Sequence, residues 1–242
     1  MLQNGEGQLA HKWYQKAAEK GHPEAQLTLG FIYYDLEQYT DAIKWLRKAA
    51  HQNLTNAQYM LAIIYEKGRG VEQSDIQAAK WYTKAAEQGM AEAQNNLGAM
   101  YRDGKGVEQS DSQAIKWYQK AAEQNIAGAQ YNLGSLYENK KLWKKAIKWH
   151  LKAAQQGLIQ SQRSLGFIHY IEKSYTESFK WFKKVAQQGD PQIQYLLGEM
   201  YYNGRGVKVS QSDAIKWFKK SAKQGYADAQ EALRKLKLNT EN

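Results

Sequence analysis

Residues able to support catalysis or bind a metal are few and scattered in this sequence of 242 residues. Cysteine is absent, which excludes disulfides, a thiol nucleophile and thiolate metal sites. No two of the five histidines have the spacing of metal ligands on one helix: His11, His22, His51, His150 and His169. No nucleophile–base pair and no convergent pair of carboxylates is visible. We therefore expect a protein that is not an enzyme, with no cofactor, no metal and no small-molecule substrate.

Three glycine-rich segments superficially resemble phosphate-binding loops. They read Gly-Arg-Gly-Val at 68–71, Gly-Lys-Gly-Val at 104–107 and Gly-Arg-Gly-Val at 204–207. A phosphate loop follows a β-strand and ends in Lys-Ser or Lys-Thr, and these segments have neither feature. Because glycine readily adopts the left-handed geometry that ends a helix, the segments instead predict helix termini.

Lysine follows a regular pattern in this chain, whose net charge is +10. One lysine precedes and another follows each of seven tryptophans, at positions −1 and +3: Lys12/Lys16, Lys44/Lys48, Lys80/Lys84, Lys116/Lys120, Lys148/Lys152, Lys180/Lys184 and Lys216/Lys220. At about 100° per residue they point away from the apolar face of a helix, so we expect a lysine ladder on the outer surface. The ladder serves either solubility or an anionic partner, a nucleic acid or an acidic membrane. The absence of stacking aromatics between the lysines favours solubility.

The seven tryptophans mark an internal repeat. They are spaced by 32 or 36 residues: Trp13, Trp45, Trp81, Trp117, Trp149, Trp181 and Trp217. Around Trp117, apolar residues recur every three or four positions over 114–122 and predict an amphipathic helix, here called the tryptophan helix. Upstream, residues 93–101 form a second such stripe around Leu97, here called the leucine helix. One such pair cannot bury its apolar faces alone, so neighbouring pairs must stack.

Glycine and asparagine are expected at helix ends. The residue eight positions after each tryptophan is always one of these two: Gly21, Asn53, Gly89, Asn125, Gly157, Gly189 and Gly225. Both tolerate the left-handed geometry of a helix C-terminus. Within the leucine helix Gly98 costs stability, so its recurrence predicts a close approach of the partner helix through equally small alanines. Ser110 or Asp111 is expected to cap the following tryptophan helix.

We predict a single domain over residues 1–242. Residues 1–22 contain a lone tryptophan helix, from about Gln8 to Lys20, interpreted as a truncated first repeat. Six complete pairs follow over 23–226, and residues 227–242 form a capping helix, because Arg234 and Lys235 stand where a next repeat would pack. No apolar signal core or membrane-length apolar run is present. We expect a cytoplasmic protein, or a periplasmic or secreted one if a leader has been removed.

The repeat resembles a known family. The pattern Ala-x-x-x-Leu-Gly-x-x-Tyr-x-x-Gly-x-Gly-Val, then Ala-x-x-Trp-Tyr-x-x-Ala-Ala-x-x-Gly, closely resembles the Sel-one-like (suppressor-of-lin-like) repeat, and residues 90–125 match it best. The shorter repeats, around Trp45, Trp149 and Trp181, look more like the related tetratricopeptide repeat. The resemblance covers almost the whole chain and implies an all-α fold, a right-handed α-superhelical solenoid of stacked antiparallel helix pairs.

The resemblance also implies a non-enzymatic scaffold for protein–protein contacts. In such families the leucine helices line a concave groove through residues two before, two after and five after the leucine. The residues carried over to these positions as partner-binding candidates are Phe31, Tyr34, Tyr59, Asn95, Arg102, Tyr131, Arg163, Phe167, Tyr170, Tyr195 and Tyr202. Aromatic and arginine side chains anchor interfaces, although such residues also pad contacts between adjacent helices.

The expected partner is a protein or a peptide segment. Within this interpretation the chain acts as a bacterial adaptor or as the immunity partner of a toxin, and its oligomeric state is open. The alternative is an anion-binding module that uses the lysine ladder to bind nucleic acid or an acidic membrane.

Overall fold

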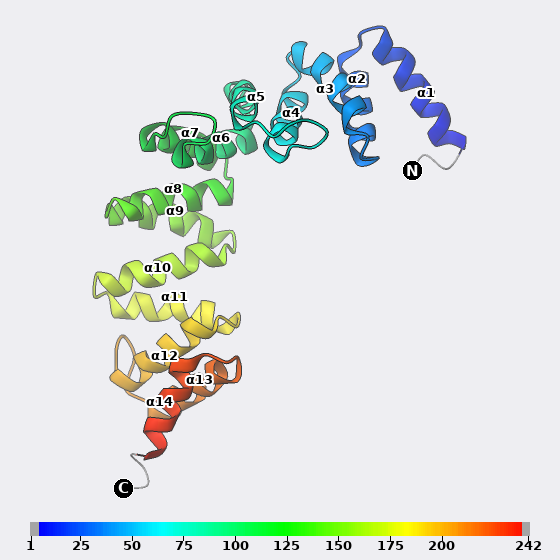
Figure 1. Ribbon diagram of the computed structural model, residues 1–242. Helices are drawn as coiled ribbons and strands as arrows, with labels where there is room; N and C mark the ends of the chain where they lie inside the picture. The colour runs from blue at the N-terminus through cyan, green and yellow to red at the C-terminus, as the bar shows by residue number, and fades with distance from the viewer. Residues whose placement is uncertain (1–4, 239–242) are drawn as a thin grey trace. The chain divides into compact units, whose positions relative to one another are not determined.

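The computed structural model describes residues 5–238, and these residues form fourteen α-helices and no β-strand (Figure 1). The helices are α1 (Gly5–Glu19), α2 (Pro23–Asp35), α3 (Tyr39–His51), α4 (Thr55–Lys67), α5 (Asp75–Glu87), α6 (Ala91–Asp103), α7 (Asp111–Glu123), α8 (Ala127–Asn139), α9 (Trp143–Gln155), α10 (Ile159–Ile171), α11 (Tyr175–Gln187), α12 (Pro191–Asn203), α13 (Gln211–Lys223) and α14 (Ala227–Leu238). Within this described range, no helix is both long and apolar enough to cross a membrane. The predicted all-α fold is confirmed. Parts of the predicted first and last segments, residues 1–4 and 239–242, lie outside the described residues.

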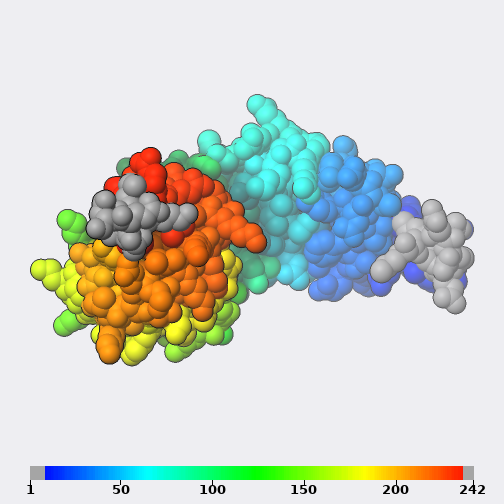
Figure 2. Space-filling model, turned by 90° about the horizontal axis from the view of Figure 1, so that it is seen from below, coloured from blue at the N-terminus to red at the C-terminus, as the bar shows by residue number. Residues whose placement is uncertain are grey.

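The helices belong to two compact units, residues 1–129 and residues 130–242. The even-numbered helices are the predicted leucine helices and the odd-numbered ones the tryptophan helices. In unit 1, α2 packs on α3, α4 on α5 and α6 on α7, while α3–α4 and α5–α6 contacts join successive pairs. In unit 2, α10 packs on α11 and α12 on α13, with α11–α12 and α13–α14 contacts between them. In the space-filling view the blue atoms of unit 1 adjoin its cyan atoms (Figure 2).

The helix ends follow the predicted turn chemistry. All seven glycine and asparagine residues that follow the tryptophan helices have positive φ, from 64° at Asn53 to 100° at Gly189. Gly104 ends α6 with a φ of 67°. Ser110 is the N-cap of α7, and its side chain accepts a hydrogen bond from the backbone N–H of Gln113. These local predictions are confirmed.

The glycine that follows the leucine in five of the leucine helices has a different partner from the one predicted: Gly30, Gly98, Gly134, Gly166 and Gly198. A Cβ atom on Gly98 would lie 2.7 Å from the ring of Tyr118, and one on Gly166 would lie 2.4 Å from the ring of Phe182. The partner is therefore the large residue after each tryptophan, and the prediction of small alanines at this contact is wrong. The missing Cβ leaves room for this side chain, which is a ring at Gly98, Gly134, Gly166 and Gly198 and a leucine, Leu46, at Gly30.

Trp45 packs against the two helices that precede it in the chain, α1 and α2. Trp45 on α3 is 7% exposed and shares a cluster with Ala18 of α1 and Leu29 of α2. Because α1 is the first described helix, Trp13 has no described pair before it and is 64% exposed. The same side chain is thus core or surface according to its place in the stack.

Buried glutamines link the repeats by hydrogen bonds. Gln94 on α6 donates to the carbonyl of Ala86 at 3.0 Å and accepts from Gln124 at 2.9 Å. The buried glutamines that donate in the same way to the carbonyl eight residues earlier are Gln26, Gln58, Gln162 and Gln194. Each also accepts from the glutamine that follows the next tryptophan helix, through Gln52, Gln88, Gln188 and Gln224. The glutamine side chain donates to a carbonyl group in the last turn of a tryptophan helix, which has no partner within that helix, and so joins consecutive pairs.

Candidate interaction surface

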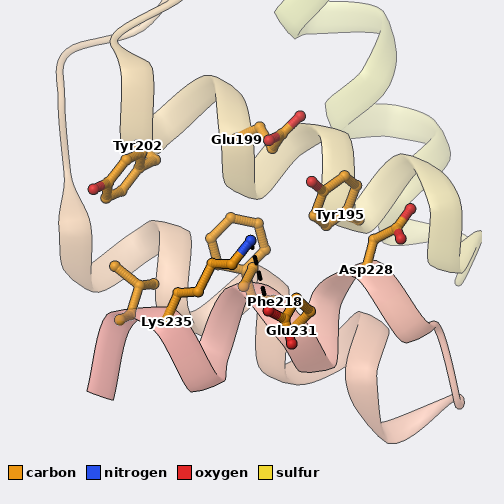
Figure 3. A pocket seen from close by; sticks show the side chains of 9 residues that line it. Tyr195, Glu199, Tyr202, Phe218, Asp228, Glu231 and Lys235 are labelled. Atoms are coloured by element: carbon orange, nitrogen blue, oxygen red, sulfur yellow. Dashed lines mark ion pairs between the residues drawn. The ribbon is translucent and has the colours of Figure 1, made fainter. Parts of the chain in front are cut away.

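A hollow of about 390 Å³ lies between α12 and α14 in unit 2 (Figure 3). It is lined by Tyr195, Glu199 and Tyr202 of α12, Phe218 of α13, and Asp228, Glu231, Ala232, Lys235 and Leu236 of α14. This lining is here called the α12–α14 hollow. Its three α12 residues stand two before, two after and five after Leu197. All three groove positions implied by the resemblance therefore line one hollow.

Unit 1 has a matching hollow of about 380 Å³ between α4 and α6. The lining of this α4–α6 hollow is Tyr59, Ile63, Glu66, Lys67, Tyr82, Asn96, Ala99, Met100, Asp103 and Lys105. Tyr59, Ile63 and Glu66 hold the same three positions around Leu61. Both units thus place these positions at a hollow between successive leucine helices.

The two hollows differ in charge. In the α4–α6 hollow, Glu66 accepts a hydrogen bond from the Tyr82 hydroxyl at 2.7 Å and lies 3.6 Å from Lys67. Burial and this carboxylate raise the pKa of Tyr82. Asp103 pairs with Arg102 at 2.7 Å. Each acid of this hollow therefore has a basic residue beside it, Lys67 for Glu66 and Arg102 for Asp103.

In the α12–α14 hollow, three carboxylates face one ammonium group. Glu231 lies 3.6 Å from Lys235 and 2.7 Å from Arg234. Burial, a hydrogen bond with Glu199 and the nearby charges of Glu199 and Asp228 raise the pKa of Tyr195 to about 12. This hollow is acidic although the chain as a whole is basic.

Four predicted partner-binding aromatics each pack one face on a ring of the adjoining tryptophan helix. The ring centroids are 5.7 Å apart for Tyr59–Tyr82 and Tyr131–His150, 5.0 Å for Phe167–Phe182 and 5.6 Å for Tyr195–Phe218. Edge-to-face and tilted geometries at these distances are favourable. All four predicted residues are half-buried, so they contribute to packing and still present surface.

Tyr34 and Tyr170 are held by arginines that sequence reasoning did not connect to them. Arg69, from the glycine-rich segment after α4, donates to the Tyr34 hydroxyl and lies 5.3 Å from that ring and 5.9 Å from the ring of Tyr39. Arg205 repeats the arrangement on Tyr170 in unit 2, at 5.8 Å from the ring. Both tyrosines therefore pack between consecutive repeats. The signal available in the sequence was the arginine between the two glycines in two of the three segments, where the third has Lys105.

The predicted arginines also have partners within the chain. Arg102 donates to both carboxylate oxygens of Asp103, at 2.7 and 3.0 Å. Arg163 lies 3.4 Å from Asp190 and 5.6 Å from the ring centroid of Phe167. Neither arginine lines a hollow described above.

The other three predicted residues differ in accessibility. Phe31 is half-buried against the core of unit 1, and Asn95 donates to the side chain of Asn96 at 3.4 Å. Tyr202 is 46% exposed, and it lines the α12–α14 hollow. Tyr202 is therefore the most accessible of the predicted partner-binding aromatics.

The lysine ladder covers the tryptophans. The lysine three residues after the tryptophan places its ammonium 4.4–4.9 Å from the ring centroid at Trp45, Trp81, Trp117, Trp149, Trp181 and Trp217. A cation at this distance is attracted to the ring face. The lysine stems therefore shield indole surface while the charged ends stay near solvent.

His150 is fully buried, with Nδ1 3.3 Å from Ser161 Oγ and Nε2 3.2 Å from Glu138 Oε2. Its ring lies where Gly134 leaves space, in the position that Phe182 occupies opposite Gly166. Over residues 5–238, no group of three or more potential metal ligands comes together.

The Sel1 repeat family model matches residues 2–22, 23–54, 55–90, 91–126, 127–139, 144–158, 163–190 and 191–226. The chain belongs to the Sel1 repeat family. A search among curated proteins gave no match. Sel1 repeats share the paired-helix architecture of tetratricopeptide repeats, a fold that generally serves as a protein-interaction scaffold.

Solved structures include close bacterial Sel1 relatives. A protective antigen of uropathogenic Escherichia coli is 36% identical, with a TM-score of 0.80 over 92% of this chain and 50% of that one. The chain thus spans half the length of that antigen. A Sel1 repeat protein from Oxalobacter formigenes is 32% identical, with a TM-score of 0.74 over 85% of this chain and 88% of that one. The tetratricopeptide repeat protein YrrB, described as having an unusual peptide-binding site, shares the fold at 18% identity and a TM-score of 0.56, over 74% of this chain and 94% of that one.

Proposed function

We propose that this Sel1 repeat protein is a non-enzymatic scaffold that binds a segment of a partner protein at the hollows between its leucine helices. The observation that carries the proposal is the shared lining of the α4–α6 and α12–α14 hollows. In both, the residues two before, two after and five after the leucine are half-buried or exposed. The first is tyrosine in both hollows, whereas the other two differ in type: Ile63 and Glu66 in one, Glu199 and Tyr202 in the other. Framework residues recur because packing requires them, whereas a binding surface is free to vary.

The hollows suit a peptide better than a small substrate. Each combines aromatic rings with polar groups at its rim, the composition typical of protein interfaces. Their walls come from successive stacked helices, so little ordering is required when a segment binds. Adaptor and toxin-immunity partner are the two biological roles within this proposal, and the identity of the bound protein distinguishes them.

The test is affinity capture from a bacterial lysate with the wild-type chain and single variants. Tyr202→Ala alters the α12–α14 hollow and Ile63→Ala the α4–α6 hollow. Tyr14→Ala is the matched control, because Tyr14 on α1 is similarly exposed, at 42%, and lines neither hollow. Circular dichroism verifies that each variant is folded.

A protein retained by wild type and by Tyr14→Ala, but lost by a hollow variant, supports the proposal. Equal retention by all four proteins contradicts it. Retention of nucleic acid or acidic lipid alone, lost as salt is raised, would assign the function to the lysine ladder instead.

A further inference from the structure

The α12–α14 hollow combines aromatic walls with uncompensated negative charge. Tyr195 and Tyr202 of α12 line one side, and Asp228, Glu231 and Lys235 of α14 line the other (Figure 3). Tyr202 is exposed and Tyr195 is half-buried. An open space bounded by ring faces and carboxylates is complementary to a cationic group that also has flat or apolar surface.

Two of the three carboxylates in this hollow have no cationic partner in the part of the chain that the structure describes. Glu231 pairs with Lys235 and Arg234, whereas no lysine or arginine pairs with Glu199 or Asp228. Both carboxylates have tyrosine partners instead: Glu199 shares a hydrogen bond with Tyr195 and Asp228 one with Tyr226, and burial together with these negative charges raises the pKa of Tyr195. The net charge of the chain is +10, so this hollow is a local negative site on a basic protein, and a site of this charge attracts a cationic group.

The hollow already holds one cation of its own. The Lys235 ammonium lies 3.6 Å from Glu231, and the side chain is 70% exposed. An exposed ion pair of this kind contributes little to stability, so the lysine ammonium is easily displaced from the carboxylate. Because Lys235 also lines the hollow, its positive charge disfavours an incoming cation there.

The α4–α6 hollow has the same architecture without the excess charge. Its two acids, Glu66 and Asp103, are accompanied by Lys67 and Lys105, and Glu66 also accepts from Tyr82. The preference for a cation is therefore a property of the last hollow and not of the repeat in general.

We propose that the α12–α14 hollow receives a basic side chain of the partner segment, arginine in preference to lysine. The inference rests on the proposed function, since it names the chemistry of the segment bound there. Arginine is preferred because its planar group donates to carboxylates on two sides while stacking on a tyrosine ring. Glu199 and Asp228 supply the carboxylates, and the exposed Tyr202 supplies the ring face, because Tyr195 already packs on the rings of Phe218 and Tyr226.

The test starts from peptides selected on the immobilised full chain from a phage-displayed random library. An enriched peptide is then measured by fluorescence polarisation beside its analogue with citrulline for arginine, which keeps the shape and removes the charge, or acetyl-lysine for lysine. The protein variants are Glu199→Gln, Asp228→Asn and Lys235→Gln. Glu177→Gln is the matched control, because it makes the same charge change on the exposed surface of α11.

We expect enriched peptides to share a basic residue, and the neutral analogue to bind about tenfold more weakly, as one partly exposed ion pair and one cation–π contact together imply. Glu199→Gln and Asp228→Asn should each weaken binding of the basic peptide about three- to fivefold and leave the neutral analogue unaffected. Lys235→Gln should strengthen binding of the basic peptide, the direction opposite to that of a merely damaged structure.

Enriched peptides without a basic residue, or equal affinity for the neutral analogue, would overturn this inference and leave the scaffold proposal standing. A loss with Glu177→Gln as large as that with Glu199→Gln would also overturn it, because the effect would then reflect net charge alone. Failure of the chain to enrich any peptide would overturn both.

Discussion

The carbonyl oxygen of Asp75 lies against the backbone of Gly106, so closely that a Cβ atom on the glycine would be 2.1 Å from it. Gly106 also has a φ of +67°. Gly106→Ala should therefore lower the free energy of unfolding by roughly 2–4 kcal/mol, from the strained backbone and the clash together. Urea denaturation followed by circular dichroism measures the change.

Gly89→Ala is the matched control for this prediction. Gly89 has a φ of +93°, and a Cβ atom there would meet nothing within 4 Å. The Gly89→Ala variant should lower the free energy of unfolding by about 1 kcal/mol, because only the backbone conformation is strained. An equal decrease in the free energy of unfolding for Gly106→Ala and Gly89→Ala would show that the contact with Asp75 does not contribute to the effect.

Replacing one of the buried glutamines that link the repeats should lower stability, even though an apolar side chain is easier to bury. Gln94→Leu leaves the Ala86 carbonyl and the Gln124 amide without this partner, for an expected loss of about 1–3 kcal/mol. Gln119→Leu, which removes only an exposed hydrogen bond to Glu123, should change stability by less than about 0.5 kcal/mol. Thermal unfolding of both variants tests the point, and a neutral Gln94→Leu would argue that the link is incidental.

Tyr118 and Tyr82 should respond in opposite ways to loss of the hydroxyl. The Tyr118 hydroxyl is buried without a hydrogen-bond partner among the described residues, so Tyr118→Phe should be neutral or stabilise by up to about 1 kcal/mol. Tyr82→Phe removes the 2.7 Å bond to Glu66 and should destabilise by about 1 kcal/mol. Chemical denaturation at neutral pH compares them, and a destabilised Tyr118→Phe would be the contrary result.

The same tyrosine predicts an alkaline loss of stability. Burial raises the pKa of Tyr118 from 10.0 to about 12. The unfolded chain ionises this residue above pH 10, while the folded chain keeps it neutral until about pH 12, so stability falls across that interval. Tyr118→Phe should reduce the fall, as measured by urea midpoints between pH 9 and 12. An unchanged pH dependence would mean that other groups control it.

Replacing tryptophan by alanine should lower stability by very different amounts at two equivalent positions of the repeat. Trp117 is 7% exposed within the core of unit 1, and Trp117→Ala should cost about 3–5 kcal/mol. Trp13 is 64% exposed, and Trp13→Ala should cost less than about 1 kcal/mol. Thermal melts of the two variants decide this, and similar losses would mean that Trp13 is covered in solution.

The helices and their ends could be predicted from the sequence because they depend on local physics repeated along the chain. Positive φ at Asn53 and Gly189 follows from residue type and from distance to the tryptophan. The partner of Gly98 was predicted wrongly, because helical periodicity identifies the face of a helix and not the residue opposite. The linking glutamines recur three residues before each leucine, yet a glutamine in a helix ordinarily lies at the surface.

The position of the candidate surface could be predicted from the sequence, but its charge could not. The three positions around Leu197 could be carried over from the family resemblance, and they line a hollow. The acidity of that hollow depends on Asp228 and Glu231 of α14, which belong to the next helix of the stack. Likewise, Arg69 reaches Tyr34 across 35 residues of sequence, a contact that no local pattern indicates.

The central claim is that partners bind at the hollows between leucine helices, and photo-crosslinking tests it most directly. A selected peptide carrying a benzophenone group is irradiated on the wild-type chain, and the modified residues are located by mass spectrometry. We predict crosslinks on the lining of the α12–α14 or the α4–α6 hollow, such as Tyr202 or Ile63. Crosslinks confined to the lysine-bearing surface of the odd-numbered helices, such as Lys120 on α7 or Lys220 on α13, would contradict the account.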